Sequence, residues 1–193
     1  NGSRMITSRR LALGIDAGGS STRWLLVDEA GEQVASGAVG PVSAVDLPRD
    51  PAEADPARVV YGPLANLLSL ARAVQDVGHP AFVLAGVTGL DTLTPEALML
   101  ERFIASSLSV EVSSVRVLGD VVTAYLASFA PGTGVLVYGG TGSVAVHVAR
   151  DGSLVRAGGH GYLVDDAGGG YWIGREALRR VLRAADEVGG PAK

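Results

Sequence analysis

The stretch LALGIDAGGSSTRWLLVD, residues 11–28, decides the fold. Leu11, Leu13 and Ile15 alternate with small or polar residues, which is the pattern of a strand with one buried face. A polar turn follows, and the apolar run 24–27 can then return along the first strand. The stretch therefore predicts a strand, a tight turn and a second strand.

The turn between these strands combines glycines and hydroxyls with a carboxylate just before it. The residues are Asp16, Gly18, Gly19, Ser20, Ser21 and Thr22. Glycine lets the backbone approach an anion closely, so N–H groups and hydroxyls of such a turn can bind phosphate. Asp16 cannot bind phosphate itself, but it can hold a Mg²⁺ that bridges to phosphate oxygens. An ordinary hairpin rich in turn residues is the other interpretation of this stretch taken alone.

Two familiar phosphate motifs do not describe this turn. It contains no lysine, so it is not the loop Gly-x-x-x-x-Gly-Lys-[Ser/Thr]. In a dinucleotide-binding motif the glycines open a helix and an acidic residue follows about 20 residues later. Here the acidic residue precedes the glycines and a strand-like run follows them, so neither motif fits and the ordinary hairpin stays open.

Composition excludes several classes of protein. The chain has 193 residues, 47% of them hydrophobic and 19% charged, which is enough for one large or two small domains with a real core. A net charge of −4 argues against a general nucleic-acid or anionic-membrane surface. The absence of cysteine excludes disulfides, thiolate metal sites and cysteine-ligated iron–sulfur clusters. No apolar run approaches 18 residues, so we expect a cytoplasmic protein without nucleic-acid or membrane partners.

The pattern of strand, polar turn and strand occurs a second time. After the segment 130–134, the runs 135–138 and 144–149 predict strands on either side of Gly139, Gly140, Thr141, Gly142 and Ser143. Two related lobes that face one ligand would show this pattern, so we expect both turns to grip one polyphosphate. The predicted organisation is a disordered, tag-like N-terminus at 1–10, a first lobe at 11–131 and the start of a second lobe at 132–193.

The remaining segments read as alternating strands and helices. Further strands are expected at 33–39, 82–87 and 115–118, which gives an opening antiparallel meander followed by later strands. Helices are expected from Asp55 and Pro56 to Gly78, from Thr94 to about Leu108, at 121–129 and at 173–185.

Four segments in order resemble the superfamily of sugar kinases, actin and Hsp70 ATPases. They are the phosphate-1 turn (18–22), the strand-to-helix junction 118–124, the phosphate-2 turn (139–143) and the glycine-rich segment 158–177. The last resembles the N-acetylglucosamine kinase-like branch of the BadF/BadG/BcrA/BcrD ATPase family. The resemblance covers about residues 10–185. It implies an α/β, ribonuclease H-like (actin-like ATPase) fold with a mixed sheet flanked by helices, in two lobes.

The resemblance also implies roles for particular residues. Asp16 would position Mg²⁺, and residues 18–22 and 140–143 would hold the β- and γ-phosphates of ATP. Asp120 would be the catalytic base toward the hydroxyl of a sugar or amino sugar, although a helix N-cap is the other interpretation of this residue. The sugar contacts implied are Ser43, Asp120, Gly159, His160 and Asp166. A homodimer is kept as an open option.

The departures from the family pattern gather on the sugar side. His160 stands where these kinases often carry tryptophan, Ala167 where they carry glutamate, and Ser43 where a sugar loop often has asparagine. Because a pocket discriminates through hydrogen bonds that a wrong substrate leaves unpaired, we expect a relaxed or altered sugar preference. The resemblance places the adenosine-binding turn after Lys193, so the second lobe is expected to be incomplete.

Four functions compete at this point. The leading one is an ATP-dependent carbohydrate kinase similar to N-acetylglucosamine kinases. An activator that bridges an iron–sulfur cluster is disfavoured because the sequence has no cysteine. A sugar-responsive repressor would need a DNA-binding domain before the first turn, where only about ten residues precede it. A protein of this fold that acts as an activator, sensor or scaffold without catalysis stays open as the alternative.

Overall fold

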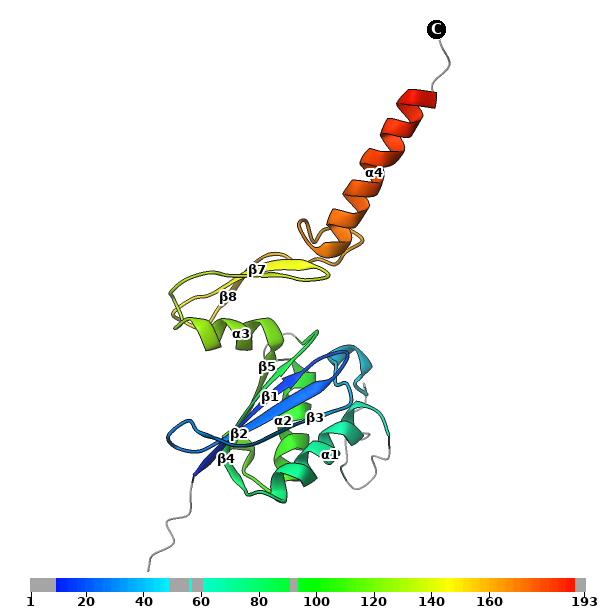
Figure 1. Cartoon of the computed structure of the whole chain (residues 1–193). Coiled ribbons are helices and arrows are strands. Elements are labelled where there is room, and N and C mark those ends of the chain that lie inside the picture. The colour runs from blue at the N-terminus through cyan, green and yellow to red at the C-terminus, as the bar shows by residue number, and fades with distance from the viewer. Residues whose placement is uncertain (1–9, 49–55, 57–60, 91–93, 190–193) are drawn as a thin grey trace, which may run out of the picture. The chain divides into compact units, whose positions relative to one another are not determined.

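The computed structural model describes residues 10–48, 56, 61–90 and 94–189, and side chains in α4 up to residue 187. Residue contacts divide the chain into two compact units, Asn1–Thr123 and Ala124–Lys193. Each unit is described by itself, with its elements labelled in Figure 1. The lobe boundary expected at 131 stays a prediction.

The first unit is built on a mixed sheet of five strands. They are β1 (Leu11–Ala17), β2 (Thr22–Val27), β3 (Gln33–Val39), β4 (Pro80–Val87) and β5 (Val115–Gly119), in the order β3-β2-β1-β4-β5. The first three strands pair antiparallel, and β4 runs parallel to both β1 and β5. The predicted opening meander is confirmed.

Two helices connect these strands, α1 (Pro63–Gln75) and α2 (Pro95–Leu108). The α2 start is as predicted, because the Thr94 hydroxyl accepts a hydrogen bond from Ala97 N and Pro95 follows directly. The predicted start of the first helix is wrong: Pro56 lies in a turn and Asp55 lies outside the described residues. Gly62, at φ 82°, immediately precedes Pro63, and this pair begins α1 instead.

The helices cover one face of this sheet. Alternation along the strands sends Leu13, Ile15, Leu26, Val83 and Val115 into a core with residues of both helices. The helical contributions to that core include Leu70, Val74, Leu100, Phe103 and Leu108. Residues of the opposite parity, Gly14, Asp16, Arg23 and Leu25 among them, are exposed. Asp16 therefore lies on the face of the sheet opposite α1 and α2.

The second unit has a smaller sheet of three antiparallel strands. They are β6 (Leu136–Gly139), β7 (Ser143–Val148) and β8 (Leu154–Gly158), in the order β6-β7-β8. The helix α3 (Asp120–Ser128) begins in the first unit and ends in this one, and α4 (Gly170–Gly189) follows the glycine-rich segment. Few side chains here are buried, chiefly Tyr125, Val146 and Val148. The predicted second strand, turn and strand are confirmed.

Candidate active site

Asp16 lies one residue before the end of β1, on the face of the sheet opposite α1 and α2. It is in register with Arg23 of β2, so the two side chains are cross-strand neighbours of opposite charge. Both line a cavity of about 370 Å³. The full lining is Gly14, Ile15, Asp16, Arg23, Trp24, Leu25, Leu84 and Thr123.

The phosphate-1 turn carries polar groups that the protein leaves free. Gly18 N donates to Ser21 O at 3.1 Å, which closes the turn. A Cβ at Gly18 would lie 3.1 Å from the same oxygen, so glycine permits this closure. Among the described residues, the N–H groups of Gly19, Ser20 and Ser21 and both serine hydroxyls make no hydrogen bond. Successive free amides of this kind form a concavity suited to phosphate oxygens.

Thr22 lies on the other side of the sheet. It begins β2 in the same parity as Trp24 and Leu26, and it is fully buried. Its hydroxyl has no hydrogen-bond partner among the residues that the structure describes. The expected phosphate contact of this hydroxyl therefore has no support in the geometry, and the free groups of the turn are those of residues 19–21.

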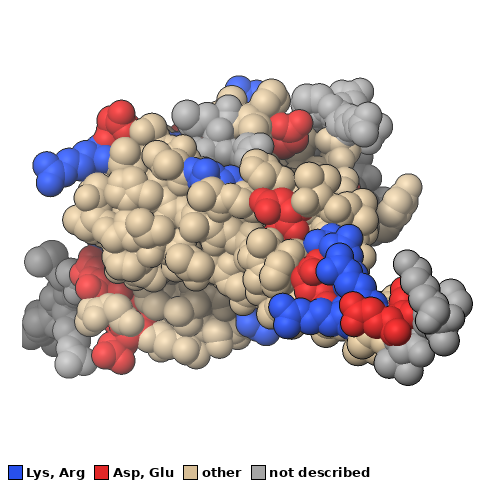
Figure 2. All heavy atoms as spheres, turned by 90° about the horizontal axis from the view of Figure 1, so that it is seen from above, with Lys and Arg blue, Asp and Glu red and all other residues tan. Residues whose placement is uncertain are grey.

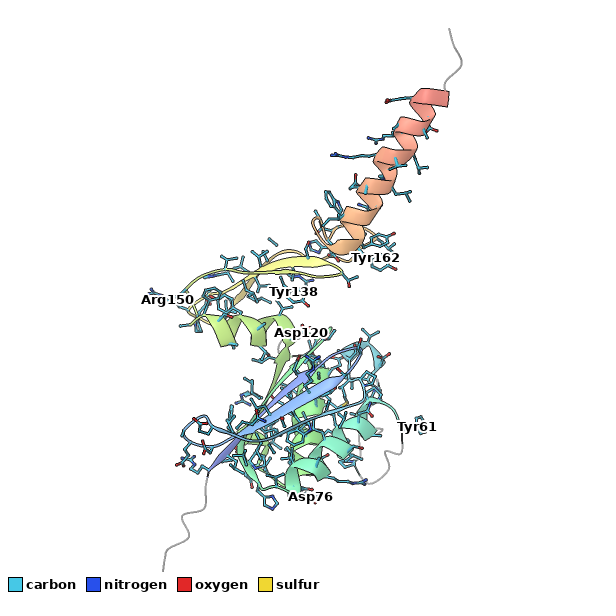
Figure 3. The ribbon with its side chains drawn as sticks, in the orientation of Figure 1. Tyr61, Asp76, Asp120, Tyr138, Arg150 and Tyr162 are labelled. Atoms are coloured by element: carbon cyan, nitrogen blue, oxygen red, sulfur yellow. The ribbon has the colours of Figure 1, made fainter. Side chains whose placement is uncertain are left out.

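Asp120 is the first residue of α3, directly after β5, as Figure 3 shows. Its Oδ1 accepts a hydrogen bond from Val121 N at 2.8 Å, and its Oδ2 accepts one from the Thr88 hydroxyl at 2.7 Å. Two donors thus fix the carboxylate in one orientation. The residue is half-buried, so a hydroxyl of a ligand can still reach it.

Thr88 joins three of the candidate segments. Besides the bond from its hydroxyl to Asp120, its N donates to Ala17 O at 2.9 Å and its carbonyl accepts from Ala44 N at 3.0 Å. An isolated parallel bridge links it to Ser43. The end of β1, the expected sugar loop and the expected base are therefore tied to one residue at the end of β4.

Ser43 is only 6% exposed. Its hydroxyl accepts a hydrogen bond from Val45 N at 3.4 Å and caps the short 3-10 helix Ala44–Asp46. Ser43 is bridged to Thr88, whose hydroxyl donates to Asp120, but the Ser43 hydroxyl itself is used to cap the short helix. Its expected contact with a sugar stays a prediction.

The phosphate-2 turn is the three-residue connection between β6 and β7. Gly140 N donates to Gly142 O at 2.8 Å, and the Ser143 hydroxyl donates to Ala167 O at 2.8 Å. Within the described part of the chain, the N–H groups of Thr141 and Gly142 and the exposed Thr141 hydroxyl make no hydrogen bond. This turn also offers adjacent free amides and a hydroxyl.

The glycine-rich segment before α4 brings Asp166 to this same turn. Asp166 has a φ of 59° and is 9% exposed. Its Oδ1 accepts from Gly161 N at 3.2 Å, and its Oδ2 lies beside Gly142, 2.2 Å from where a Cβ would stand. His160 is exposed, whereas the Gly159 carbonyl accepts a hydrogen bond from the Arg156 guanidinium.

The family model of the BadF/BadG/BcrA/BcrD ATPases matches residues 13–193. The chain belongs to the BadF/BadG/BcrA/BcrD ATPase family. Its sheet order and its likeness to solved structures give it the ribonuclease H-like, actin-like ATPase fold.

Two curated relatives of this family member are sugar kinases. An N-acetyl-D-glucosamine kinase of Dictyostelium discoideum is 28% identical over 188 residues, covering 94% of this chain and 57% of the relative. An N-acetylmuramic acid/N-acetylglucosamine kinase of Clostridium acetobutylicum is 28% identical over 120 residues, covering 62% and 38%. The chain thus spans about half the length of the curated relatives it matches.

The chain is also similar to solved structures. The crystal structure of a candidate N-acetylglucosamine kinase of Chromobacterium violaceum matches with a TM-score of 0.58 and 26% identity, over 89% of this chain and 56% of that one. A transcriptional regulator of the ROK family matches with a TM-score of 0.50 and 17% identity, over 77% and 38%. The second likeness concerns the fold alone.

The residues of this BadF/BadG-family chain fit a Mg²⁺-nucleotide in their chemistry. Among the described residues, no group of three or more His, Cys, Asp or Glu could hold a metal. Mg²⁺ with a nucleotide usually needs only one or two carboxylates, because phosphate oxygens and waters complete its shell. Exposed Asp16 beside a turn with free amides meets that requirement.

Sequence reasoning assigned no role to Arg23 or Thr88. The sequence signal for Arg23 was its position across the hairpin, since the length of the turn sets the strand register. For Thr88 it was a hydroxyl at the carboxyl end of β4, the edge of a parallel sheet where ligands bind. Both signals depend on knowing which strands are neighbours.

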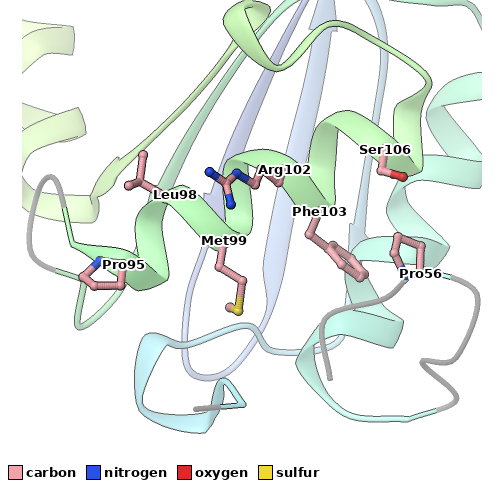
Figure 4. Close-up of a pocket in the computed structure, with 7 residues that line it drawn as sticks. All are labelled: Pro56, Pro95, Leu98, Met99, Arg102, Phe103 and Ser106. Carbon is pink, nitrogen blue, oxygen red and sulfur yellow. The ribbon is translucent and has the colours of Figure 1, made fainter. Parts of the chain in front are cut away.

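Three further features of the described residues lie apart from the predicted site residues. A cavity of about 430 Å³ along α2, drawn in Figure 4, is lined by Pro56, Pro95, Leu98, Met99, Arg102, Phe103 and Ser106. Figure 2 shows acidic and basic side chains interspersed on the face in view, with neither sign gathered into a broad patch. No described helix is both long enough and apolar enough to span a membrane.

Proposed function

We propose that the protein transfers the γ-phosphoryl group of ATP to a sugar hydroxyl, in the manner of an N-acetylglucosamine kinase. The observation that carries the proposal is the Asp120 carboxylate, held by Thr88 and by Val121 N at the carboxyl edge of the parallel strands. The kinase relatives support the same reading. A sugar or amino sugar is the proposed substrate, and ATP with Mg²⁺ the proposed cofactor.

Asp120 acts in this proposal as the general base. It accepts the proton of the attacking sugar hydroxyl while that oxygen bonds to the γ-phosphorus and the bond to the β-phosphate oxygen breaks. When bound, ATP would supply the phosphoryl group, and Mg²⁺ would neutralise part of the negative charge on its phosphates. Within the first unit, the free amides of residues 19–21 would bind phosphate oxygens and Asp16 would hold the cation. Within the second unit, the free amides of residues 141–142 would bind phosphate oxygens as well.

The sugar side is proposed to be permissive. Ser43 is buried with its hydroxyl in use, and Asp166 accepts from Gly161 N and lies beside Gly142. These two side chains therefore have less hydrogen-bonding capacity left for a sugar. Gly159 and His160 remain proposed sugar contacts. A cytoplasmic location belongs to the same proposal and is supported by a sequence without cysteine. A homodimer stays an open option.

A coupled assay of ADP release tests the proposal. The intact protein is offered ATP and Mg²⁺ with N-acetylglucosamine, N-acetylmuramic acid, glucosamine or glucose in turn. Sugar-dependent ADP release is expected, and Asp120→Asn should lower its rate by about 10²- to 10⁴-fold while ATP binding persists. ATP binding without release for any sugar would instead favour the sensor or scaffold alternative. A preference for N-acetylglucosamine of a thousandfold or more, about 4 kcal/mol in transition-state terms, would refute the permissive sugar side.

A further inference from the structure

The phosphate-2 turn is bonded to the first residues of α4. Gly170 N donates to Gly140 O at 2.8 Å, and Tyr171 N donates to Thr141 O at 3.2 Å. These two N–H groups belong to the first turn of a helix, where no partner exists inside the helix. Two N–H groups at the N-terminal end of α4 are thus paired with two carbonyl groups of the turn.

These two bonds set the direction of the free amides. A peptide unit is planar and trans, so its N–H points opposite to its carbonyl. The Gly140 carbonyl shares a peptide with Thr141 N, and the Thr141 carbonyl shares one with Gly142 N. Because α4 holds both carbonyls, the N–H groups of Thr141 and Gly142 point away from α4, toward a common side.

The approach of the helix to the turn requires glycine at position 169. A Cβ there would lie 2.7 Å from both the C and the Cα of Gly142, and 2.9 Å from Thr141 O. All three are backbone atoms, which cannot rotate aside as a side chain can. Gly170 is less restricted, because its Cβ would lie 3.3 Å from Gly140 O.

We propose that residues 169–171 preset the amides of the phosphate-2 turn for the phosphates of ATP, with Gly169 as the positioning residue. The inference rests on the proposed function and deepens it. The family resemblance links the glycine-rich segment to the sugar. In this inference, residues 169–171 of that segment instead support nucleotide binding. Substitutions here therefore change ATP affinity more than sugar affinity.

The first test is Gly169→Ala in the intact protein, with the dissociation constant of a fluorescent ATP analogue and Mg²⁺ measured directly. We expect affinity for the analogue to fall by about tenfold or more, because the turn must move to admit the methyl group. KM for the sugar should change less than twofold. The matched control is Gly174→Ala, in the same helix, where a Cβ meets nothing within 4 Å.

A second pair of variants keeps the test valid if Gly169→Ala does not fold. Tyr171→Pro removes the N–H that bonds Thr141 O, at a position in the first helical turn where proline is tolerated. Tyr171→Ala removes the same ring but keeps that N–H. The proline variant should bind the ATP analogue about fivefold more weakly than the alanine variant, the value of one net hydrogen bond.

The outcomes separate this inference from the proposed function. If the wild-type protein binds the analogue, and folded variants at 169 and 171 bind it equally well, the positioning role is overturned. Weaker sugar binding with unchanged analogue binding also overturns it, because the segment then acts on the sugar. A wild-type protein that binds no analogue would refute both proposals, whereas binding without sugar-dependent ADP release would refute the kinase alone.

Discussion

The phosphate-1 turn joins two strands of a five-stranded sheet, one face of which is packed by two helices. The phosphate-2 turn joins two strands of a three-stranded sheet whose side chains are mostly exposed or half-buried. The first turn is closed by a bond inside itself, from Gly18 N to Ser21 O. The second turn has such a bond too, but it also accepts two hydrogen bonds from α4, from residues 30 positions later in the sequence.

The two turns owe their rigidity to different interactions. The first is stabilised by buried apolar area, which many side chains share, so loss of one polar contact changes it little. The second depends on a few hydrogen bonds and on glycines that permit close contact, so each of these matters individually. The proposed base, Asp120, belongs to the first unit, so the proposal assigns proton transfer to the more rigidly packed of the two units.

The largest expected effect tests this assignment of the base. Asp120→Asn should lower kcat by about 10²- to 10⁴-fold, because the amide cannot accept the proton. Binding of an ATP analogue should change little. Steady-state kinetics and direct binding measure the two quantities. Retained turnover would show that the base is another residue, and proton transfer could then no longer be assigned to the first unit.

Next in size is the contrast in buried area between the units. Phe103→Ala in the first unit should lower the free energy of unfolding by about 3–5 kcal/mol, because Phe103 is 2% exposed within the core. Leu178→Ala in α4 of the same 193-residue chain should change it by less than about 0.5 kcal/mol, since Leu178 is 59% exposed. Chemical denaturation of the chain measures both. Equal losses would mean that the second unit has a core of its own.

An intermediate effect is expected at Thr88. Thr88→Val removes the hydroxyl that orients Asp120 and should lower kcat by about tenfold, a loss of about 1.4 kcal/mol, the size of a hydrogen bond to a charged group. KM for ATP should stay within twofold, and Thr88→Ser should restore most of kcat.

A control for Thr88 is available in the same unit. Thr94→Ala removes the N-cap of α2 and should lower stability by about 1 kcal/mol without touching the site. If Thr94→Ala reduces kcat as much as Thr88→Val does, the effect of Thr88 is on stability and not on the base.

The smallest expected effect concerns Thr22. Its hydroxyl is buried without a described partner, and leaving such a group unpaired costs about 1–3 kcal/mol. Thr22→Val keeps the shape and removes that cost, so the thermal midpoint should stay unchanged or rise, with ATP affinity unaltered. A clear loss of ATP affinity would show that the Thr22 hydroxyl contributes to phosphate binding. The first turn would then also depend on single polar contacts.

The sequence was most informative where structure is local. Alternation at residues 11–15 and the repeat at 135–149 predicted both strand–turn–strand units, because the period of a strand is visible within a few residues. The predicted helix start at 55–56 is wrong, because the helix begins at Pro63 after Gly62 and the prediction used only the signal at Pro56. The same alternation buries Thr22 at the start of β2, and its expected role in the phosphate-1 turn stays a prediction.

Long-range contacts were beyond sequence reasoning. The bond from Thr88 to Asp120 links the ends of two neighbouring strands, and nothing near either residue in sequence indicates it. The close contact between Gly169 and Gly142 is of the same kind, since its only trace in the sequence is a run of glycines. Such runs indicate that something must come near, but they do not identify the partner.

The bonds between α4 and the phosphate-2 turn also order events during synthesis. Ribosomes add about 5–20 residues per second, so the 30 residues that separate Gly140 from Gly170 take about 2–6 seconds. The strands that support the phosphate-1 turn are complete once residue 119 has emerged. The nascent chain therefore completes the surroundings of its two turns at different times, and for those seconds the second turn lacks both of its hydrogen bonds from α4.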